Sequence, residues 1–345
     1  MSLSPERLQP PRLFTSRDWV ERAEYVHLLW PVWGASHWHD RYRDLFGDFL
    51  TQGRGFFTLT EDPGSADYFL PPCGWQEGGS PQAMRMAELA ARYGRPMVIF
   101  FNSDFEEPIP IDDAVIFRTS MNASSAGPNE QAWPGWTCDV LRTYGGGRLE
   151  SRAKPEQPTV GYCGYLDYRN NFERLQRTIR GQIAPWARLR GDAVRTLSKA
   201  HEIDSRFVLR RRFGGHAGAA ERDEYARNLL TCDYALVARG RGNFSFRLYE
   251  AMSAGAIPVF LDTDCRLPLD DVIPYRELFV WISANDVHSI ADHLTRFHAA
   301  HDSSSLNSHR RRIREVYDRY LSPLAYHREV ADRLARRATM DPTAR

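Results

Sequence analysis

The sequence has no long apolar run and almost no net charge. No apolar stretch approaches the ~20 residues that a helix needs to cross a bilayer, so no transmembrane segment is expected. The 45 Lys and Arg residues balance 44 Asp and Glu residues, which leaves a formal net charge of +1. This balance gives no general attraction to nucleic acid or to an anionic membrane. Nucleic acid is therefore not expected as a partner, while peripheral association with a membrane stays open.

The sequence also shows no cysteine spacing typical of disulfides or zinc sites and no pattern typical of a secretion signal. The five cysteines are odd in number, scattered and without a CxxC motif, which indicates a reduced compartment and no zinc site. Residues 1–14 are polar and proline-rich, which is not typical of a signal peptide. We therefore expect a cytoplasmic protein.

Apolar runs alternate with helical patterns in both halves of the chain. The length of 345 residues is enough for two domains, at ~100–200 residues each. Strands that alternate with helices favour parallel sheets with helices on both faces. Loops rich in Ser, Asn, Gly and Pro over residues 119–156 indicate a boundary. We expect an N-terminal α/β domain over 1–155, a second α/β domain over 156–300 with a cleft between the two, and a helical extension over 301–345 that packs back across the domains.

The expected elements follow from this alternation. Short apolar runs predict strands and 3.6-residue periodicity predicts helices. The predicted strands cover residues 25–30, 56–59, 66–71, 96–101, 114–117, 159–165, 206–211, 233–238, 256–261 and 279–282, with a short extended piece at 270–273. The predicted helices cover residues 16–23, 41–50, 81–93, 170–200, 221–231, 288–299 and 308–337.

One stretch in the second half, residues 236–261, predicts a strand, a glycine-rich turn, a short helix and another strand. Gly240 and Gly242 loosen the backbone of the turn, and Asn243 or Ser245 can cap the helix. Such a turn directs backbone N–H groups and a helix N-terminus to one place, which suits an anion.

Charged side chains surround this turn. Arg239, Arg241 and Arg247 bring positive charge to it, so a phosphate or diphosphate is the expected ligand. Arg247 and Glu250 are three residues apart and share one face of the predicted helix. We expect Arg247 to bind a phosphate and Glu250 to accept hydrogen bonds from ribose hydroxyls. The alternative is an ion pair between the two on a solvated helix.

The same stretch also approximates a dinucleotide-binding fingerprint. Gly240, Gly242 and Ser245 occupy its glycine positions, and Asp262 would be the acidic residue that binds ribose. The third glycine is absent and the helix is short, so an NAD(P)-dependent oxidoreductase is the less favoured alternative. Asp262 and Asp264 also form a DxD triplet, which holds a divalent cation in some sugar-nucleotide enzymes; we interpret it as a solvated turn.

The first half offers a candidate general base. Asp104 follows the apolar run 96–101, and ligands of open α/β sheets lie at the carboxyl ends of strands. Asp104 is therefore placed to accept a proton from a substrate. Glu106 and Glu107 are weaker candidates on the same loop.

A second loop of the first half carries two histidines and an aspartate. His37 and His39 could lie on one face of an extended segment, but the sequence identifies no third or fourth metal ligand. We expect His37, His39 and Asp40 to contribute to the acceptor side of the cleft and predict no metal site.

Two regions resemble the exostosin-type glycosyltransferases. Residues 60–71 are similar to a signature of the family's acceptor-side domain. Residues 236–268 resemble its donor-binding region, which has an arginine-glycine turn, a serine-x-arginine pair, a glutamate-alanine step, a glycine-x-isoleucine-proline-valine strand and a leucine-proline pair. Here these are Arg239-Gly240, Ser245-Phe246-Arg247, Glu250-Ala251, residues 255–259 and Leu267-Pro268.

This resemblance implies an α/β fold of the GT-B type, with two Rossmann-like domains that face a central cleft. It implies inverting, metal-independent transfer, with no cofactor, to a hydroxyl of a glycan or glycoconjugate, as in polysaccharide biosynthesis. The domain over 156–300 would bind the nucleotide-sugar donor, for which we expect UDP as the nucleotide, and the domain over 1–155 would be the acceptor-side domain. By position, Glu250 would hold the ribose, while Arg239, Ser245 and Arg247 would hold the pyrophosphate. The resemblance does not assign the base; from its position after the run 96–101, we expect Asp104 to deprotonate the acceptor.

The sequence departs from the family in two places. Animal members carry an N-terminal membrane anchor and often further domains, and neither is expected here. The histidine-rich loop that often follows the middle strand of the first domain is Asn102-Ser103-Asp104 in this chain. A catalytically inactive partner that binds sugar nucleotides or glycans is therefore a further alternative.

Overall fold

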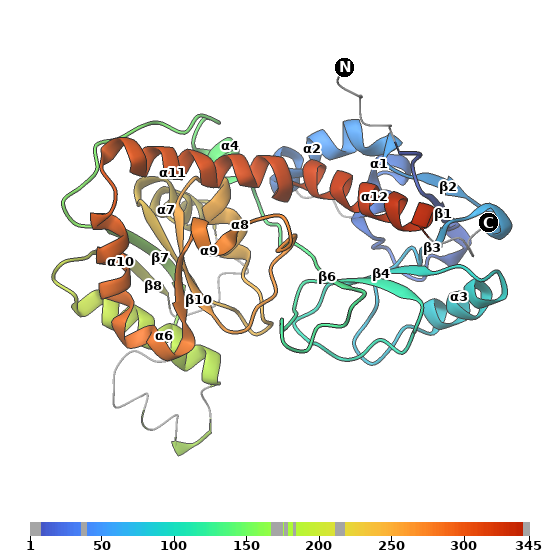
Figure 1. The fold of residues 1–345 in the computed structure, drawn as a ribbon, viewed down its shortest axis with the longest axis horizontal. Helices are drawn as coiled ribbons and strands as arrows, with labels where there is room; N and C mark the ends of the chain where they lie inside the picture. The colour runs from blue at the N-terminus through green and yellow to red at the C-terminus, as the bar shows by residue number, and fades with distance from the viewer. Residues whose placement is uncertain are drawn as a thin grey trace. The chain divides into compact units, whose positions relative to one another are not determined.

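The computed structural model describes residues 8–35, 40–166, 175, 179–181, 184–210 and 218–340. The chain forms two compact units. The first contains residues 1–121, 125–133 and 319–345, and the second contains 122–124 and 134–318. Each unit is built on one parallel β-sheet (Figure 1). The expected α/β class with two parallel sheets is therefore confirmed.

The unit boundaries differ from the expected domain boundaries. The chain passes into the second unit at Pro134 rather than after residue 155, because helix α4 (Val140–Tyr144) packs against helices of that unit. Asp139 caps α4 and forms an ion pair with Arg314 at 2.6 Å, which ties this segment to α11 (Ser303–Val316). The expected extension 301–345 is also divided: α11 belongs to the second unit, and α12 (Pro323–Met340) belongs to the first.

The first unit has a six-stranded sheet in the order β2-β1-β3-β4-β5-β6, and every neighbouring pair is parallel. All residues of its central strands β4 and β5 are buried, as the apolar runs predict. The strands are β1 (Arg12–Phe14), β2 (Thr58–Thr60), β3 (Tyr68–Phe69), β4 (Met97–Phe101), β5 (Ala114–Arg118) and β6 (Glu130–Ala132).

The strand predicted at residues 25–30 is wrong. A 3₁₀ helix (His27–Leu29) and the short helix α1 (Trp30–Trp33) occupy this region instead. Pro31 explains the difference, because proline lacks the N–H that a strand ladder needs and favours the first turn of a helix. A short apolar run alone does not distinguish a buried strand from a buried helical segment.

Helices α2 (Asp40–Gln52), α3 (Pro81–Arg92) and α12 complete the first unit. The Tyr68 hydroxyl donates to the Leu334 carbonyl of α12 at 2.9 Å, and the Tyr326 hydroxyl of α12 donates to the Ala132 carbonyl at 2.5 Å. α12 also packs beside α2 (Figure 1). The last helix of the chain therefore covers the sheet that the first residues of the chain begin.

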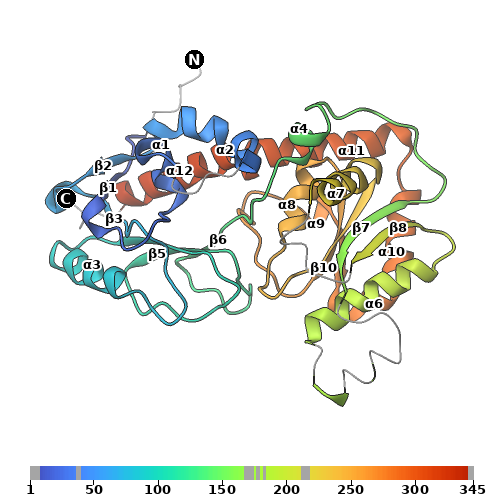
Figure 2. The ribbon, with the colours of Figure 1, turned by 180° about the vertical axis from the view of Figure 1, so that it is seen from behind.

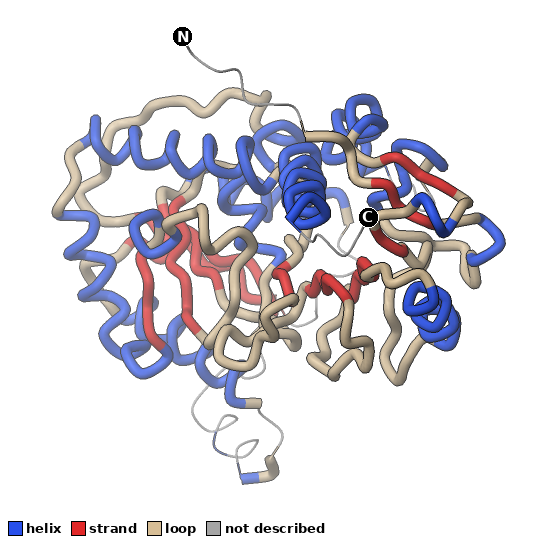
Figure 3. The backbone as a smooth tube through the Cα atoms, turned by 45° about the vertical axis from the view of Figure 1, so that its right-hand side comes forward, coloured by secondary structure: helices blue, strands red, loops and turns tan. Residues whose placement is uncertain are grey.

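The second unit has a five-stranded parallel sheet in the order β11-β10-β9-β7-β8. Beside the strands, which are red in Figure 3, α6 packs against α10. α4 packs against α7 and α8, and α8 also packs against α11 (Figure 2). The strands are β7 (Thr159–Tyr165), β8 (Asp204–Arg210), β9 (Tyr234–Val237), β10 (Ile257–Asp262) and β11 (Val280–Ser283); the remaining helices are α6 (Pro185–Lys199), α7 (Ala219–Thr231), α8 (Phe246–Ser253), α9 (Tyr275–Leu278) and α10 (Ile290–Ala299).

The extended piece predicted at residues 270–273 is a turn instead. Leu269 has a positive φ of 56°, and the N–H groups of Val272 and Ile273 return to its carbonyl. Across the part of the chain that the structure describes, no helix is both long and apolar enough to cross a membrane.

Candidate functional site

The candidate site lies in the second unit, at the carboxyl ends of β7 and β9. The chain leaves β7 for β8 on one side of the sheet, whereas β9 lies on the other side of β7. Such a switch point separates the two loops and makes room for a ligand at the carboxyl ends of the strands. The loop that follows β9, residues 238–245, leads into α8.

A buried asparagine holds this loop in place. Asn243 is fully buried, and its amide donates to the Thr263 carbonyl at 2.9 Å while its side-chain oxygen accepts from the Thr263 hydroxyl at 2.7 Å. The Gly240 N–H donates to the Phe244 carbonyl at 3.0 Å, which closes the turn. Ser245 is the N-cap of α8, but its side chain makes no capping hydrogen bond. Of the two expected caps, Asn243 thus stabilises the loop and Ser245 takes the capping position.

Arg247 lies in the first turn of α8 and is partly buried. Its Nη2 donates to the Cys163 carbonyl at the end of β7, and its Nε lies 3.4 Å from the Tyr225 hydroxyl. The guanidinium also stacks on Tyr162, 4.3 Å from the ring centre. A Cβ on Gly164 would lie 2.9 Å from Arg247 Nη2, so glycine at this position makes room for the guanidinium.

Glu250 lies one turn further along α8 and has two hydroxyl partners. Thr137 donates to its Oε1, and Tyr225 of α7 donates to its Oε2. Burial, and after it the neighbouring Glu250 carboxylate, raises the pKa of Tyr225 well above its usual value, so the phenol stays neutral and keeps its hydrogen. The Tyr225 hydroxyl therefore stands between Arg247 and Glu250, where the alternative interpretation expected a direct ion pair.

Further arginines surround the loop. Arg239 Nη2 donates to the Arg241 carbonyl at 2.9 Å, so this side chain folds back on its own turn. Arg190 of α6 donates to the Arg239 carbonyl at 3.5 Å and stacks on Trp186. The structure thus brings Arg239, Gly240, Arg241, Ser245, Arg247 and Glu250 into one unit and one loop-helix segment.

The two acidic residues of the DxD triplet have structural partners. Asp262 accepts from the Trp281 indole at 2.9 Å, and its other oxygen accepts from the N–H of Asp264 at 2.9 Å. Asp264 has a positive φ of 62° and accepts from the Ser124 N–H at 3.2 Å. These contacts hold a turn, as expected. Over the described ranges, no group of three or more His, Cys, Asp or Glu side chains is arranged to hold a metal ion.

Asp104 lies in the first unit, in the bend that follows β4, and is exposed. Its two neighbours have structural partners: Glu106 accepts from the Ser120 hydroxyl at 2.9 Å, and Glu107 accepts from the Gly78 N–H at 2.9 Å. Asp104 is thus exposed, whereas Glu106 and Glu107 are half-buried.

The histidine loop is not described in the same detail. His37 and His39 lie outside the described residues. Asp40 begins α2, but only its backbone is described. The expected acceptor-side role of these three residues stays a prediction.

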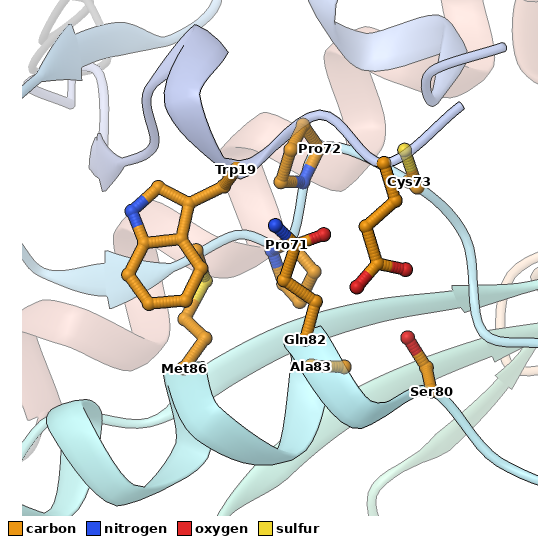
Figure 4. A pocket seen from close by; sticks show the side chains of 9 residues that line it. Trp19, Pro71, Pro72, Cys73, Ser80, Gln82, Ala83 and Met86 are labelled. Atoms are coloured by element: carbon orange, nitrogen blue, oxygen red, sulfur yellow. The ribbon is translucent and has the colours of Figure 1, made fainter. Parts of the chain in front are cut away.

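A small pocket lies in the first unit, where the chain continues beyond β3 towards α3. Its lining includes Trp19 and Met86 on one side, Cys73 and Ser80 on the other, and Pro71 between them (Figure 4). Its cavity volume is about 10 Å³, which is room for about one water molecule. Sites for small molecules usually measure roughly 300–1,000 Å³, so this pocket is too small for a nucleotide.

Sequence reasoning missed several residues of the site. Tyr225, Thr137 and Gly164 all contact or make room for Arg247 or Glu250, and Arg190 joins the arginines from α6. Their only sequence signal is weak: Gly164 falls near the end of a predicted strand, where a parallel sheet places its ligands.

Comparison with known proteins agrees with the resemblance seen in the sequence. Residues 178–297 match the Exostosin GT47 domain, which includes the loop, Arg247 and Glu250. The chain is 30% identical to Exostosin-1 homolog of Caenorhabditis elegans over 108 residues, which are 29% of this chain and 25% of that protein. It is 38% identical to Exostosin-1 of Drosophila melanogaster over 61 residues, 18% of this chain and 8% of that protein. The chain thus spans a quarter or less of the length of these relatives.

Solved structures of glycosyltransferases are also similar to this chain. WaaG, a glycosyltransferase involved in lipopolysaccharide biosynthesis, is 15% identical with a TM-score of 0.32, over 78% of this chain and 75% of that chain. CalG4, the calicheamicin glycosyltransferase, is 11% identical with a TM-score of 0.34, over 80% of this chain and 76% of that chain.

Proposed function

From the exostosin-type region over residues 178–297, we propose that the chain is a glycosyltransferase that uses a nucleotide-sugar donor, with UDP as the nucleotide. The observation that carries the proposal is the arrangement of Arg247, Tyr225 and Glu250 at the switch point of a parallel sheet. A guanidinium suits a diphosphate, and a carboxylate suits a ribose diol. The second unit would therefore bind the donor.

The arginines would serve the departing group. When the bond between the sugar and the diphosphate breaks, negative charge develops on the diphosphate oxygens, and positioned cations and N–H groups stabilise it. Arg247 and the N-terminal turn of α8 would supply this stabilisation, with Arg239 and Arg241 beside them. In this proposal the fixed arginine charges do what a bound Mg²⁺ does in metal-dependent enzymes. Transfer should then continue unchanged in the presence of EDTA.

The first unit would supply the acceptor side. We propose that Asp104, exposed at the carboxyl end of β4, removes the proton from a hydroxyl of a glycan or glycoconjugate. The activated oxygen would attack the anomeric carbon from the face opposite the diphosphate, which inverts the configuration. Two units with parallel sheets are the architecture that such GT-B chemistry uses.

Calorimetric titration with UDP tests the donor site. Arg247→Ala removes the charge-assisted hydrogen bonds to the diphosphate, which are worth about 1.5–3 kcal/mol, or about tenfold to a hundredfold in affinity. Arg206→Ala is the matched control, because Arg206 lies in the same unit but pairs with Asp204 at the edge of the sheet. A melting curve of each variant checks the fold, since Arg247 also holds Cys163. Unchanged UDP affinity in a folded Arg247→Ala protein would overturn the donor site.

An assay of UDP release from UDP-sugars separates the alternative of an inactive binding partner. Such a protein would bind UDP and show neither transfer nor slow hydrolysis of any UDP-sugar. A glycosyltransferase would release UDP from its own donor sugar in the presence of acceptor.

A further inference from the structure

We infer that Tyr225 is a positioning residue that keeps Arg247 and Glu250 apart and so prepares Glu250 for ribose. This inference rests on the proposed function. Tyr225 projects from α7, whereas Arg247 and Glu250 both lie on α8. Its hydroxyl is in contact with both of them, with Arg247 Nε at 3.4 Å and with Oε2 of Glu250.

The direction of each hydrogen bond follows from the number of hydrogens. A phenol hydroxyl has one hydrogen, a guanidinium only donates, and an ionised carboxylate only accepts. The Tyr225 hydrogen must therefore point to Glu250, and the Tyr225 oxygen accepts from Arg247. The hydroxyl thus both donates and accepts, and these two hydrogen bonds fix its position between the two charged groups.

The acceptor capacity of Glu250 then matches a ribose. A carboxylate has about four acceptor positions. Thr137 and Tyr225 occupy one on each oxygen, which leaves about one on each oxygen for a further donor. The 2′- and 3′-hydroxyls of a ribose present two adjacent donors. The two protein hydroxyls thus orient Glu250 without saturating it.

Loss of the Tyr225 hydroxyl would change this arrangement. Residues three apart on a helix are neighbours, so Glu250 could then turn to Arg247 and form the direct ion pair that Tyr225 now prevents. In that ion pair the guanidinium would donate to the carboxylate, so the remaining acceptor positions of Glu250 would no longer be available to ribose. The residue therefore acts on selectivity for the ribose hydroxyls.

The test compares UDP with 2′-deoxy-UDP by calorimetry. In the wild-type protein we expect UDP to bind roughly tenfold or more tighter, because the missing hydroxyl leaves a carboxylate position unfilled. In Tyr225→Phe the ratio of the two affinities should fall toward one. Tyr234→Phe is the control, because Tyr234 is a fully buried tyrosine of the same unit whose hydroxyl bonds to His298 at 3.0 Å. It should keep the wild-type ratio.

A merely structural role of Tyr225 would weaken both ligands equally and leave the ratio unchanged, which would overturn the inference. Thr137→Val provides a second test if Tyr225→Phe does not fold, because it removes the other hydroxyl that orients Glu250. The ratio should fall in this variant too, and an unchanged ratio would also count against the inference. Failure of the wild-type protein to bind UDP would instead overturn the proposed function itself.

Discussion

Two histidines with lowered pKa values, the fully buried His327 and the half-buried His27, should make the first unit sensitive to acid. His327 of α12 is fully buried, stacked on Phe49 at 3.8 Å between ring centres and in edge contact with Trp133 at 5.1 Å. His27 packs against Trp30 at 4.4 Å. Burial lowers the pKa of His27 to about 4 and that of His327 to about 3, although the Pro323 carbonyl partly offsets the effect at His327. Both rings are therefore neutral in the folded protein at pH 7.

The direction of the pH effect follows from proton binding. Well above pH 6.5, the ordinary histidine pKa, neither the folded nor the unfolded state protonates these rings, and they add no pH dependence. Below pH 6.5 the unfolded chain binds protons that the folded state excludes, so stability falls until the pH reaches the folded pKa values of about 4 and 3. Between pH 6.5 and pH 5, an interval of about 1.5 units, each ring lowers the free energy of unfolding by about 1.36 kcal/mol per pH unit. At pH 5 the loss is therefore about 2 kcal/mol for each ring. The two together cost about 4 kcal/mol, a large part of the ~5–15 kcal/mol of a typical domain.

Urea unfolding at pH 7 and pH 5 measures this effect. The wild-type free energy of unfolding should fall by about 4 kcal/mol from these two groups, in addition to the contribution of carboxylates. His327→Gln cannot take up a proton, so its loss between the two pH values should be smaller by about 2 kcal/mol, even if it is less stable at pH 7. His288→Gln is the control, because His288 is exposed in the second unit. If His327→Gln loses as much stability as the wild-type protein, burial of this ring does not cause the acid sensitivity.

Three further results are expected. Asp104→Asn should leave UDP binding intact and abolish transfer, measured by release of UDP in the presence of acceptor; retained transfer would move the base elsewhere. Gly164→Ala should displace Arg247 and lower UDP affinity about tenfold, since one charge-assisted hydrogen bond is lost, while Gly47→Ala, which meets open space, should not. Arg314→Ala should lower the free energy of unfolding by about 3 kcal/mol, because it leaves buried Asp139 without its cation; a loss under ~0.5 kcal/mol, as for an exposed surface residue, would contradict this.

The strands with long apolar runs could be predicted from the sequence, whereas the three-residue strands β1 and β6 could not. β4, β7, β9 and β10 are buried on both faces, so each leaves an apolar run between turn residues. β6 has only three residues, Glu130–Ala132, with no apolar run, and fell within a region predicted as loop. Its place in the sheet comes from pairing with β5, which the local sequence does not encode.

The sequence could predict the site residues that are close together in the chain, but not those that distant segments bring to the site. Arg247 and Glu250 share a helix, and their spacing alone placed them on one face. Tyr225 reaches them from another helix, and Thr137 comes from a segment that had been assigned to the other domain. The spacing predicted that Arg247 and Glu250 would be neighbours, but only the fold shows that the Tyr225 hydroxyl lies between them.

The division of the first unit along the chain has a consequence for how the protein is made. The second unit draws almost all its residues from the continuous stretch 134–318, whereas the first needs both the opening residues and α12. Domains tend to fold as units during synthesis, from the N-terminus onward, yet here the unit that begins first must wait for the helix that comes last. Until α12 emerges, Phe49 and Trp133 lack the His327 ring that they contact in the finished fold. Until then, the residues of the first unit that precede Pro134 keep apolar side chains without their final packing partner.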